Sequence, residues 1–157
     1  MNKHLKYLSY VLRHKYYVGK ALLKLGGWRM WYRVLKHDWT KFMPSEWFPY
    51  VEYFNNPSDD HSERAIQRLN FDYAWLHHLR LNSHHRQYYM AQEDNGSITV
   101  LDMPYLDIVE MVADWKGAGL AQHNSHSVEE WYYEHTAVGE QLAPYTRQIV
   151  EELIKEV

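Results

Sequence analysis

The sequence predicts a mainly α-helical protein, and three observations support this prediction. Apolar residues recur at spacings of three and four along several stretches, as they do on the buried face of a helix. Glycine and proline are scarce, with seven and five residues in a chain of 157, which argues against many short strands joined by tight turns. Hydrophobic residues make up 46% of the chain, so it can build a core of its own. We expect a single helical bundle over residues 1–157, with one small two-stranded hairpin inserted into it.

The first two predicted helices lie on either side of Gly26-Gly27. Residues 2–25 carry an inward stripe at helical spacing, formed by Tyr7, Val11, His14, Val18, Ala21, Leu22 and Leu25. Glycine ends this helix because it readily takes the left-handed conformation of a helix cap. A second helix is expected from Trp28 to Lys41, with an inward side formed by Met30, Trp31, Val34, Leu35 and Asp38. A carboxylate at the end of an apolar stripe is costly unless it is paired or bound to a metal.

The middle of the chain predicts a short bent helix and a long one. Pro44 breaks the second helix, and Ser45 can cap a short helix that Pro49 bends or splits. A polar loop separates it from a helix expected over residues 61–81. The wide apolar face of that helix consists of Ile66, Leu69, Tyr73, Ala74, Trp75, Leu76 and His78.

Residues 88–101 are the only plausible sheet in the chain. Asn95-Gly96 favours a type I′ hairpin turn, with the apolar segments Tyr88-Tyr89-Met90 and Ile98-Thr99-Val100 on its two sides. We therefore expect a two-stranded ribbon appended to the helical body.

Three further helices are predicted after the hairpin. Pro104 suits the first turn of a helix that runs through Trp115 and stops before Gly117-Ala118-Gly119. Ser127 and the glutamate three residues later form a capping box that starts another helix. A last helix follows Pro144.

Aromatic residues are abundant, and most of them are expected in the core. Trp28, Trp31, Trp75 and Trp115 all follow predicted helix stripes. Tyr17, Tyr88 and Tyr89 are the ones that we expect beside a pocket.

Composition excludes several classes of protein and site. No apolar run approaches the 18 or so residues of a membrane span, and the N-terminal residues lack the apolar region of a signal peptide. Cysteine is absent, so disulfides, thiolate metal sites and thiol nucleophiles are excluded. A cytoplasmic location fits these features and is our expectation.

Charge is distributed unevenly along the chain. Residues 1–41 contain ten Lys or Arg and one acidic residue, whereas the remaining 116 residues contain seven Lys or Arg and nineteen acidic residues. The two parts could simply neutralise each other on packing, or the basic part could attract an anionic substrate. Basic residues are spread around the first helix and not gathered on one face, so we expect no dedicated nucleic-acid surface.

Residues suited to metal binding occur at five places. These are His14, His37-Asp38, His77-His78, His84-His85 and Asp114. Each has a simple structural explanation when taken alone: a hydrogen-bonded core histidine, a histidine at a helix end, a loop residue or a buried acceptor. Together they offer more ligands than one ion needs, and nitrogen and oxygen ligands suit divalent Mn, Fe, Co, Zn or Mg. We therefore expect a site for two divalent metal ions.

Lys41 is the cation nearest to the His-Asp pair. In a continuous helix it would share a face with His37, four residues before it, and with Asp38, three residues before it. A positive charge would then lie where a metal-bound anion binds. The alternative is a partly buried ion pair between Lys41 and Asp38 beside an ordinary histidine.

The order of these residues resembles the HD-domain superfamily of metal-dependent phosphohydrolases. A histidine on one helix precedes the dyad that opens His37-Asp38-Trp39-Thr40-Lys41, and later histidines and a final aspartate follow. The HD-x-x-K form with a following His-His pair is most similar to the subgroup that includes the HD-GYP cyclic-dinucleotide phosphodiesterases. Residues 74–78, 82–85 and 110–116 also resemble a family of small HD-like proteins of phages and bacteria. The GYP segment is missing, and Arg86 follows the His pair at a place where HD-GYP enzymes carry an acidic residue.

The resemblance implies a role for each residue. His14, His37, Asp38 and Asp114 would bind one metal, and Asp38 would bridge to a second metal bound by His78, His84 and His85. His77 remains an alternative to His78, and one or both of His84 and His85 would ligate. Asp38 and Lys41 would be the catalytic residues. Lys41, Arg13 and Arg86 would contact the substrate phosphate.

Three functions follow from this reading. The first is hydrolysis of a nucleotide or another small phosphate ester by a hydroxide that bridges the two metals. The expected partner is then a small phosphorylated substrate, with nucleotides as the first candidates. The second is a di-iron oxygenase of the HD type, which needs the same ligands. The third is a metal-binding module without catalytic activity.

Overall fold

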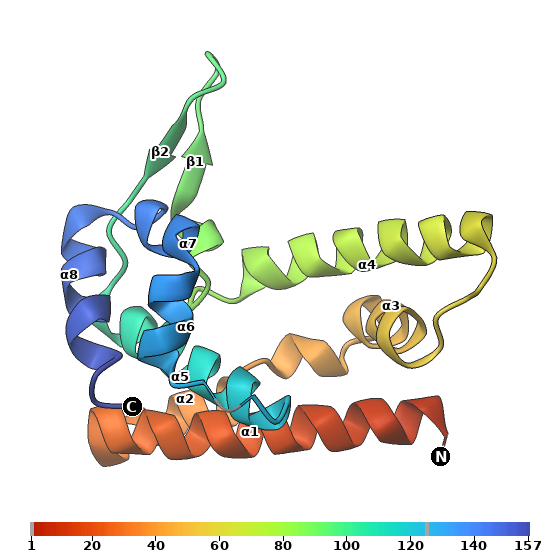
Figure 1. Ribbon diagram of the computed structural model, residues 1–157, viewed down its shortest axis with the longest axis horizontal. Helices are drawn as coiled ribbons and strands as arrows, with labels where there is room; N and C mark the ends of the chain where they lie inside the picture. The colour runs from red at the N-terminus through yellow and green to blue at the C-terminus, as the bar shows by residue number, and fades with distance from the viewer. Residues whose placement is uncertain (1, 125) are drawn as a thin grey trace.

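The structure is a computed structural model that describes residues 2–124 and 126–157, and it is mainly helical, as predicted (Figure 1). A two-stranded antiparallel hairpin projects from the helical body. The α-helices are α1 (Lys3–Gly26), α2 (Trp31–Lys36), α3 (Pro44–Asn55), α4 (His61–Leu81), α5 (Tyr105–Ala121), α6 (Val128–Glu134), α7 (Thr136–Glu140) and α8 (Pro144–Leu153). The strands are β1 (Met90–Gln92) and β2 (Ile98–Val100), and short 3-10 helices form η1 (Gly27–Met30), η2 (Trp39–Phe42) and η3 (Arg86–Tyr89).

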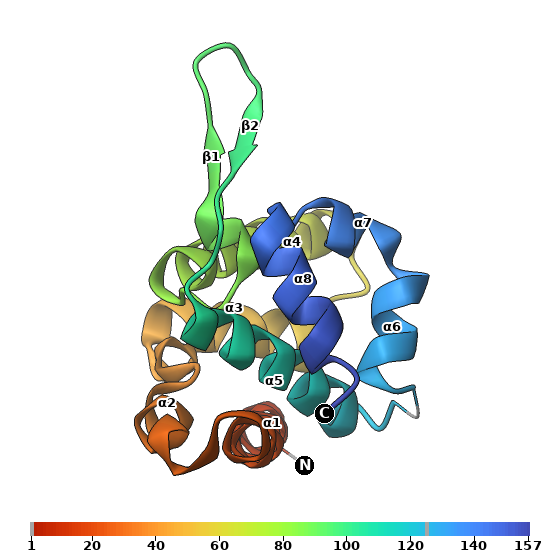
Figure 2. The same cartoon turned by 90° about the vertical axis from the view of Figure 1, so that its left-hand side faces the viewer.

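Helices α1 and α5 pack along each other and form the base of the fold (Figure 2). The predicted inward stripe of α1 is buried from Tyr7 to Leu22. The prediction that the α5 helix stops before Gly117 is wrong, because the helix continues to Ala121. A Cβ atom at Gly117 would lie 2.3 Å from Val18 Cγ2 and 2.8 Å from the Val18 backbone nitrogen. Gly117 therefore permits close helix packing, and does not end a helix.

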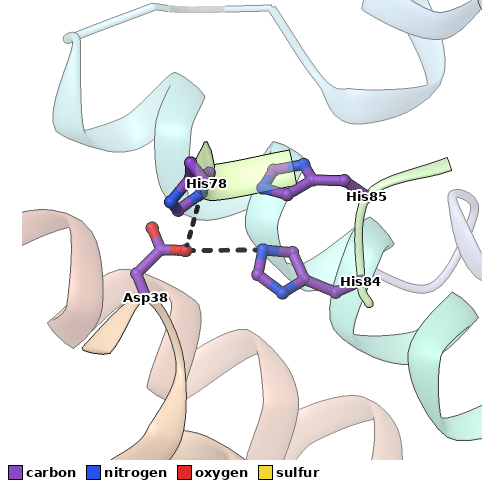
Figure 3. Close-up of side chains that lie close together, drawn as sticks. All are labelled: Asp38, His78, His84 and His85. Atoms are coloured by element: carbon purple, nitrogen blue, oxygen red, sulfur yellow. Dashed lines mark ion pairs between the residues drawn. The ribbon is translucent and has the colours of Figure 1, made fainter. Parts of the chain in front are cut away.

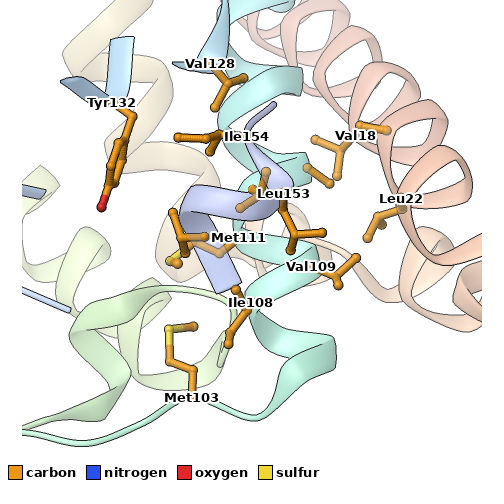
Figure 4. Close-up of a cluster of buried hydrophobic side chains, with 14 of the residues drawn as sticks. Val18, Leu22, Met103, Ile108, Val109, Met111, Val128, Tyr132, Leu153 and Ile154 are labelled. Carbon is orange, nitrogen blue, oxygen red and sulfur yellow. The ribbon is translucent and has the colours of Figure 1, made fainter. Parts of the chain in front are cut away.

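The main core lies between α1, α5, α6 and α8 (Figure 4). Val18 and Leu22 of α1 face Val109 of α5, and Val128 and Leu153 close the core from the C-terminal helices. The predicted capping box at the start of α6 is present, with reciprocal bonds between Ser127 and Glu130. These contacts fold the C-terminal third of the chain onto α5.

A smaller core joins α1 to α3 and α4. Its buried members are Tyr7, Val11, Tyr50, Val51 and Ala74. Pro49 lies inside α3 without splitting it. The predicted wide apolar face of α4 is only partly correct, because its stripe of Ile66, Leu69, Tyr73 and Leu76 is 42–67% exposed. Helix α4 packs on α3 through the opposite side, which carries Phe71, Ala74 and His78.

The predicted helix over residues 28–41 is interrupted. Helix α2 ends at Lys36, and Asp38 adopts a left-handed conformation with φ 52° and ψ 28° before η2 begins. The break turns His37 and Asp38 into the interior while the preceding turn faces outward. Trp28, Trp31 and Leu35 are therefore 76%, 54% and 66% exposed, which corrects their predicted place in the core.

The hairpin forms where predicted but with a different turn. Met90 pairs with Val100 and Gln92 with Ile98. Gly96 has a positive φ of 84°, whereas Asn95 does not, and a type I′ turn needs both residues positive. Glu93 instead bonds both Gly96 and Ser97 through its backbone, which extends the loop by one residue. Within the described part of the chain, no helix is long and apolar enough to span a membrane.

Candidate metal centre

The predicted metal-binding residues converge where the two cores meet. His14 comes from α1, His37 and Asp38 from the break after α2, His78 from the end of α4, His84 and His85 from the following loop, and Asp114 from α5. His14, His37, Asp38, His78 and His84 are at most 3% exposed. The structure thus brings together all seven residues that the sequence predicts, although 100 positions separate the first from the last.

Asp38 lies at the centre because of its unusual backbone. Aspartate is among the few residues other than glycine that tolerate the left-handed region. The Lys41 backbone N–H donates to the Asp38 carbonyl at 3.1 Å and closes the turn. This turn directs the buried carboxylate of Asp38 toward α1 and α4 at the same time.

The first group of ligands surrounds Oδ2 of Asp38. His14 Nε2 lies 3.2 Å from this atom and 3.1 Å from Asp114 Oδ1. His37 Nε2 lies 3.5 Å from Asp38 Oδ2 and 3.4 Å from Asp114 Oδ1. These two histidines and two aspartates have ligand atoms within 4.8 Å of one another.

The second group surrounds the other oxygen of the same carboxylate. His78 Nε2 lies 3.3 Å and His84 Nε2 lies 3.4 Å from Asp38 Oδ1 (Figure 3). His85 also offers a ligand atom to this group within 4.8 Å of the others. Asp38 therefore presents one oxygen to each group, as a bridging carboxylate does.

The spacing of these atoms fits metal coordination. Two ligand atoms that are each about 2.1 Å from one ion are about 3.0 Å apart at a right angle and about 3.4 Å apart at the tetrahedral angle. The distances from the four histidine Nε2 atoms to the Asp38 oxygens, 3.2 to 3.5 Å, lie in or next to this range. Among the described residues, Asp38 Oδ1 and Nε2 of His78, His84 and His85 have no hydrogen-bond partner. Buried polar atoms without partners are costly, so these His and Asp groups could hold metal ions.

Two buried glutamates, which were not predicted from the sequence, contact the Nδ1 atoms of two of these histidines. Glu46 Oε2 lies 2.8 Å from His78 Nδ1, and Glu110 Oε1 lies 3.0 Å from His37 Nδ1. A carboxylate that accepts the Nδ1–H proton leaves Nε2 free to ligate. His77 bonds the other Glu46 oxygen from the exposed side, so His78 is the member of the pair that faces the cluster. Glu110 could have been found from its position one helical turn before Asp114.

Further polar contacts fix the two glutamates. Arg33 donates to Glu110 Oε2 at 2.6 Å and to Asp107 at 2.5 Å. The hydroxyl of Thr40 donates to Glu46 Oε2 at 3.0 Å. His37 and His78 are therefore held in place by a connected network of hydrogen bonds.

Electrostatics around Asp38 favour a cation. Burial would raise the pKa of Asp38, but His37, Lys41 and His78 hold it well below its usual value. Burial would lower the pKa of His37, but the carboxylates of Asp38, Asp114 and Glu110 raise it to about 10. The site thus carries enough negative charge to retain a proton on a buried imidazole, and a divalent cation would satisfy the same charge.

Lys41 contacts Asp38 as predicted, but the backbone between the two residues differs from the predicted helix. Its Nζ is 2.5 Å from Asp38 Oδ2. Because the helix breaks at Asp38, the contact arises from the η2 turn and not from a shared helix face. The simple Asp38–Lys41 pair is therefore present, but it accounts for only one of the groups around the carboxylate.

The two arginines predicted to contact substrate lie in different surroundings. Arg13 lines a cavity that also contains His14, Lys41 and Asp114. Arg86 instead donates to the Gln141 side chain at 2.9 Å and does not line this cavity. Its role as a substrate contact gains no support from the geometry.

Comparison with known proteins places the chain in a family. The family profile DUF5662, described as a family of unknown function, matches residues 3–156. The chain belongs to DUF5662. No curated protein and no solved structure matches it. DUF5662 membership assigns no activity, so the evidence for function lies in the residues of the candidate centre.

Proposed function

We propose that this protein is a two-metal phosphohydrolase that cleaves a nucleotide or another small phosphate ester. The observation that carries the proposal is the position of Asp38, whose two oxygens each face a separate group of histidine and aspartate ligands. A carboxylate shared between two cation sites is typical of two-metal enzymes, whose paired ions stabilise the attacking and leaving oxygens of an in-line displacement at phosphorus. The resemblance to HD-domain phosphohydrolases in residue order supports the same reaction class.

The residues divide into three roles. His14, His37, Asp38 and Asp114 would hold one ion, and Asp38, His78, His84 and His85 the other. When bound, two divalent ions lower the pKa of a water molecule and neutralise charge on the phosphoryl group. Glu46 and Glu110 keep the Nε2 atoms of His78 and His37 free to ligate.

Lys41 is suited to orient the phosphate group. It lines the cavity that reaches the centre, and its charge is fixed because the Asp38 and Asp114 carboxylates outweigh burial and raise its pKa. A cation beside the reacting group stabilises the transition state more strongly in a site with little water than it would on the surface. In hydrolysis, water oxygen bonds to phosphorus as the ester P–O bond breaks, and the departing oxygen takes up a proton.

The experiment is reconstitution followed by assay. Purified protein is stripped with a chelator, reloaded separately with Mn, Fe, Co, Zn or Mg, and assayed under nitrogen against bis-p-nitrophenyl phosphate and a panel of nucleotides. The proposal expects metal-dependent release of phosphate or of nitrophenol, and loss of activity by 100-fold or more, on the order of a metal-ligand deletion, in Asp38→Ala. A matched control is Asp72→Ala, which removes an exposed carboxylate paired with Arg68.

Other results would redirect or overturn the proposal. Oxygen consumption that requires iron, without hydrolysis under nitrogen, would support a di-iron oxygenase. A protein that binds metal but turns over no substrate in either assay would support the binding module. Equal activity in wild type and Asp38→Ala would show that the hydrolysis arises elsewhere.

A further inference from the structure

A large cavity opens onto one side of the candidate metal centre. It has a volume of about 740 Å³ and lies between α1, α3, α4 and α5. His14, Lys41, His85 and Asp114 of the centre lie on its wall. Volumes of about 300–1,000 Å³ are typical of sites for small molecules. A molecule bound here would contact the metal ligands and Lys41 directly.

One part of the cavity wall carries hydrogen-bond donors without partners. The hydroxyls of Tyr7 and Tyr50 and the Nε atom of Arg13 are buried and bond to no other described residue. Tyr7 is 2% and Tyr50 is 7% exposed, and their ring centroids lie 6.0 Å apart. A buried donor left unpaired destabilises the fold, so three of them on one wall call for an explanation.

The two phenols are suited to donate to an anion. Burial raises the pKa of both Tyr7 and Tyr50, so both remain protonated hydroxyls. Lys41 is close enough to both to act on them electrostatically. Tyr7 and Tyr50 therefore lie near Lys41, in the part of the cavity beside Asp38, and Arg13 lines the same cavity.

The remaining wall of the cavity is aromatic. Phe54, Phe71 and Trp75 line it. Phe54 and Phe71 meet edge to face, with centroids 5.1 Å apart and planes at 86°. Phe54 is 58% exposed, so a ring that entered the cavity would cover apolar surface that now faces solvent.

We propose that this cavity selects an anion that carries a planar aromatic group. Tyr7, Tyr50 and Arg13 donate to the anion's oxygens, while Phe54, Phe71 and Trp75 hold the ring. For a hydrolase, the substrate is then a phosphate ester with an aromatic group, and this last step rests on the proposed function. Binding of the anion does not rest on it, because the cavity and its donors exist whether or not the centre is catalytic.

The test measures binding without turnover. Metal-loaded protein is titrated by calorimetry with phenylphosphonate, methylphosphonate, inorganic phosphate and the phosphonate analogue of adenosine monophosphate, because the P–C bond of a phosphonate is not an ester bond that the protein could hydrolyse. Phenylphosphonate should bind about 10-fold or more tightly than methylphosphonate, from stacking of the ring. Preference for the adenosine phosphonate over phenylphosphonate would identify the ring as a nucleobase, and the reverse preference would identify it as a simple arene.

Variants separate the contribution of the hydroxyl donors from that of the aromatic wall. Tyr7→Phe and Tyr50→Phe should each weaken phenylphosphonate and methylphosphonate binding about 10-fold or more, as expected for a hydrogen bond to a charged group. Phe54→Ala should lower only the preference for the phenyl compound. The matched control is Tyr132→Phe, because Tyr132 also has a buried hydroxyl with no bond to a described residue but lies outside the cavity.

Thermal melting of the ligand-free variants adds a second readout. Loss of an unpartnered hydroxyl should leave the melting temperature of Tyr7→Phe and Tyr50→Phe unchanged or raise it, so weaker binding cannot be attributed to misfolding. Wild-type binding in both variants, or equal affinity for the phenyl and methyl compounds, would overturn the inference. If the loaded protein hydrolyses no phosphate ester yet binds phenylphosphonate through Tyr7 and Tyr50, the proposed function fails and this inference stands.

Discussion

Glu46 and His78 form a fully buried pair, with Glu46 Oε2 2.8 Å from His78 Nδ1. This contact sets which imidazole nitrogen carries the proton, and it leaves Nε2 directed at Asp38. The pair therefore determines whether the second group of ligands can bind a cation. Its replacement should affect metal binding more than a substitution of similar size elsewhere.

Glu46→Gln should weaken metal binding about 10-fold to 100-fold, the usual effect of removing a partner that orients a metal-binding histidine. The amide can still accept a hydrogen bond but no longer carries the negative charge that favours the required tautomer. Titration with a competing chromophoric chelator measures the change. His77→Ala is the control, because His77 contacts the same glutamate from the exposed side, and it should retain wild-type affinity. Equal effects of the two variants would contradict the roles assigned to His77 and His78.

Removal of metal should lower the thermal stability of the protein. An ion present at about 100 times its dissociation constant stabilises the fold by about 2.7 kcal/mol. For a chain of this size that corresponds to about 5–10 °C in melting temperature. Differential scanning calorimetry before and after chelation, and after reloading, measures the shift. A chelator should lower the melting temperature of Asp38→Ala by less than that of the wild type, and an equal shift in that variant would place the stabilising ion outside the centre.

Gly117→Ala should destabilise the protein by about 1–3 kcal/mol, the range for overpacking a tight contact. The added methyl group would meet Val18 side-chain and backbone atoms, and the backbone atoms cannot move away. Gly119→Ala is the matched control on the same helix, because its Cβ would have only Asn124 Cβ near it, at 4.0 Å. It should be neutral or stabilising by up to about 1 kcal/mol. Chemical denaturation of both variants tests the packing of α1 on α5.

The two faces of α4 should respond differently to charge. Leu69→Lys lies on the exposed stripe and should change the free energy of unfolding by no more than about 0.5 kcal/mol. Ala74→Lys would bury an ammonium group against α3 and should cost more than about 3 kcal/mol. Denaturation curves that showed the opposite order would mean that α4 packs through the other face.

The sequence predicted the helical class and the members of the centre better than it predicted local geometry. His14 belongs to an inward stripe, and His37 with Asp38 begins a motif whose residue order indicates metal chemistry, so neither required knowledge of the fold. The break at Asp38 left no such signal. Residues 28–41 contain neither proline nor glycine, so nothing in the sequence marks the end of the helix there. The left-handed turn at Asp38 is stabilised by buried contacts with distant segments.

Burial of one helix face is a similar case. The apolar residues of α4 surround much of the helix, and the sequence does not say which side α3 covers, so Leu69 was expected inside. Glu46 was missed for a related reason. A glutamate in the first turn of a helix is ordinarily a surface residue, and only the approach of His77 and His78 from α4 gives it a buried role.

The central claim is that the buried cluster holds two divalent ions with Asp38 between them. The most direct test is the number of metal ions bound per chain after equilibrium dialysis, measured by inductively coupled plasma mass spectrometry. We expect two ions per chain in the wild type and fewer in Asp38→Ala, with Asp72→Ala unchanged. No bound metal in the wild type at saturating concentrations, or the same two ions in Asp38→Ala, would contradict the account.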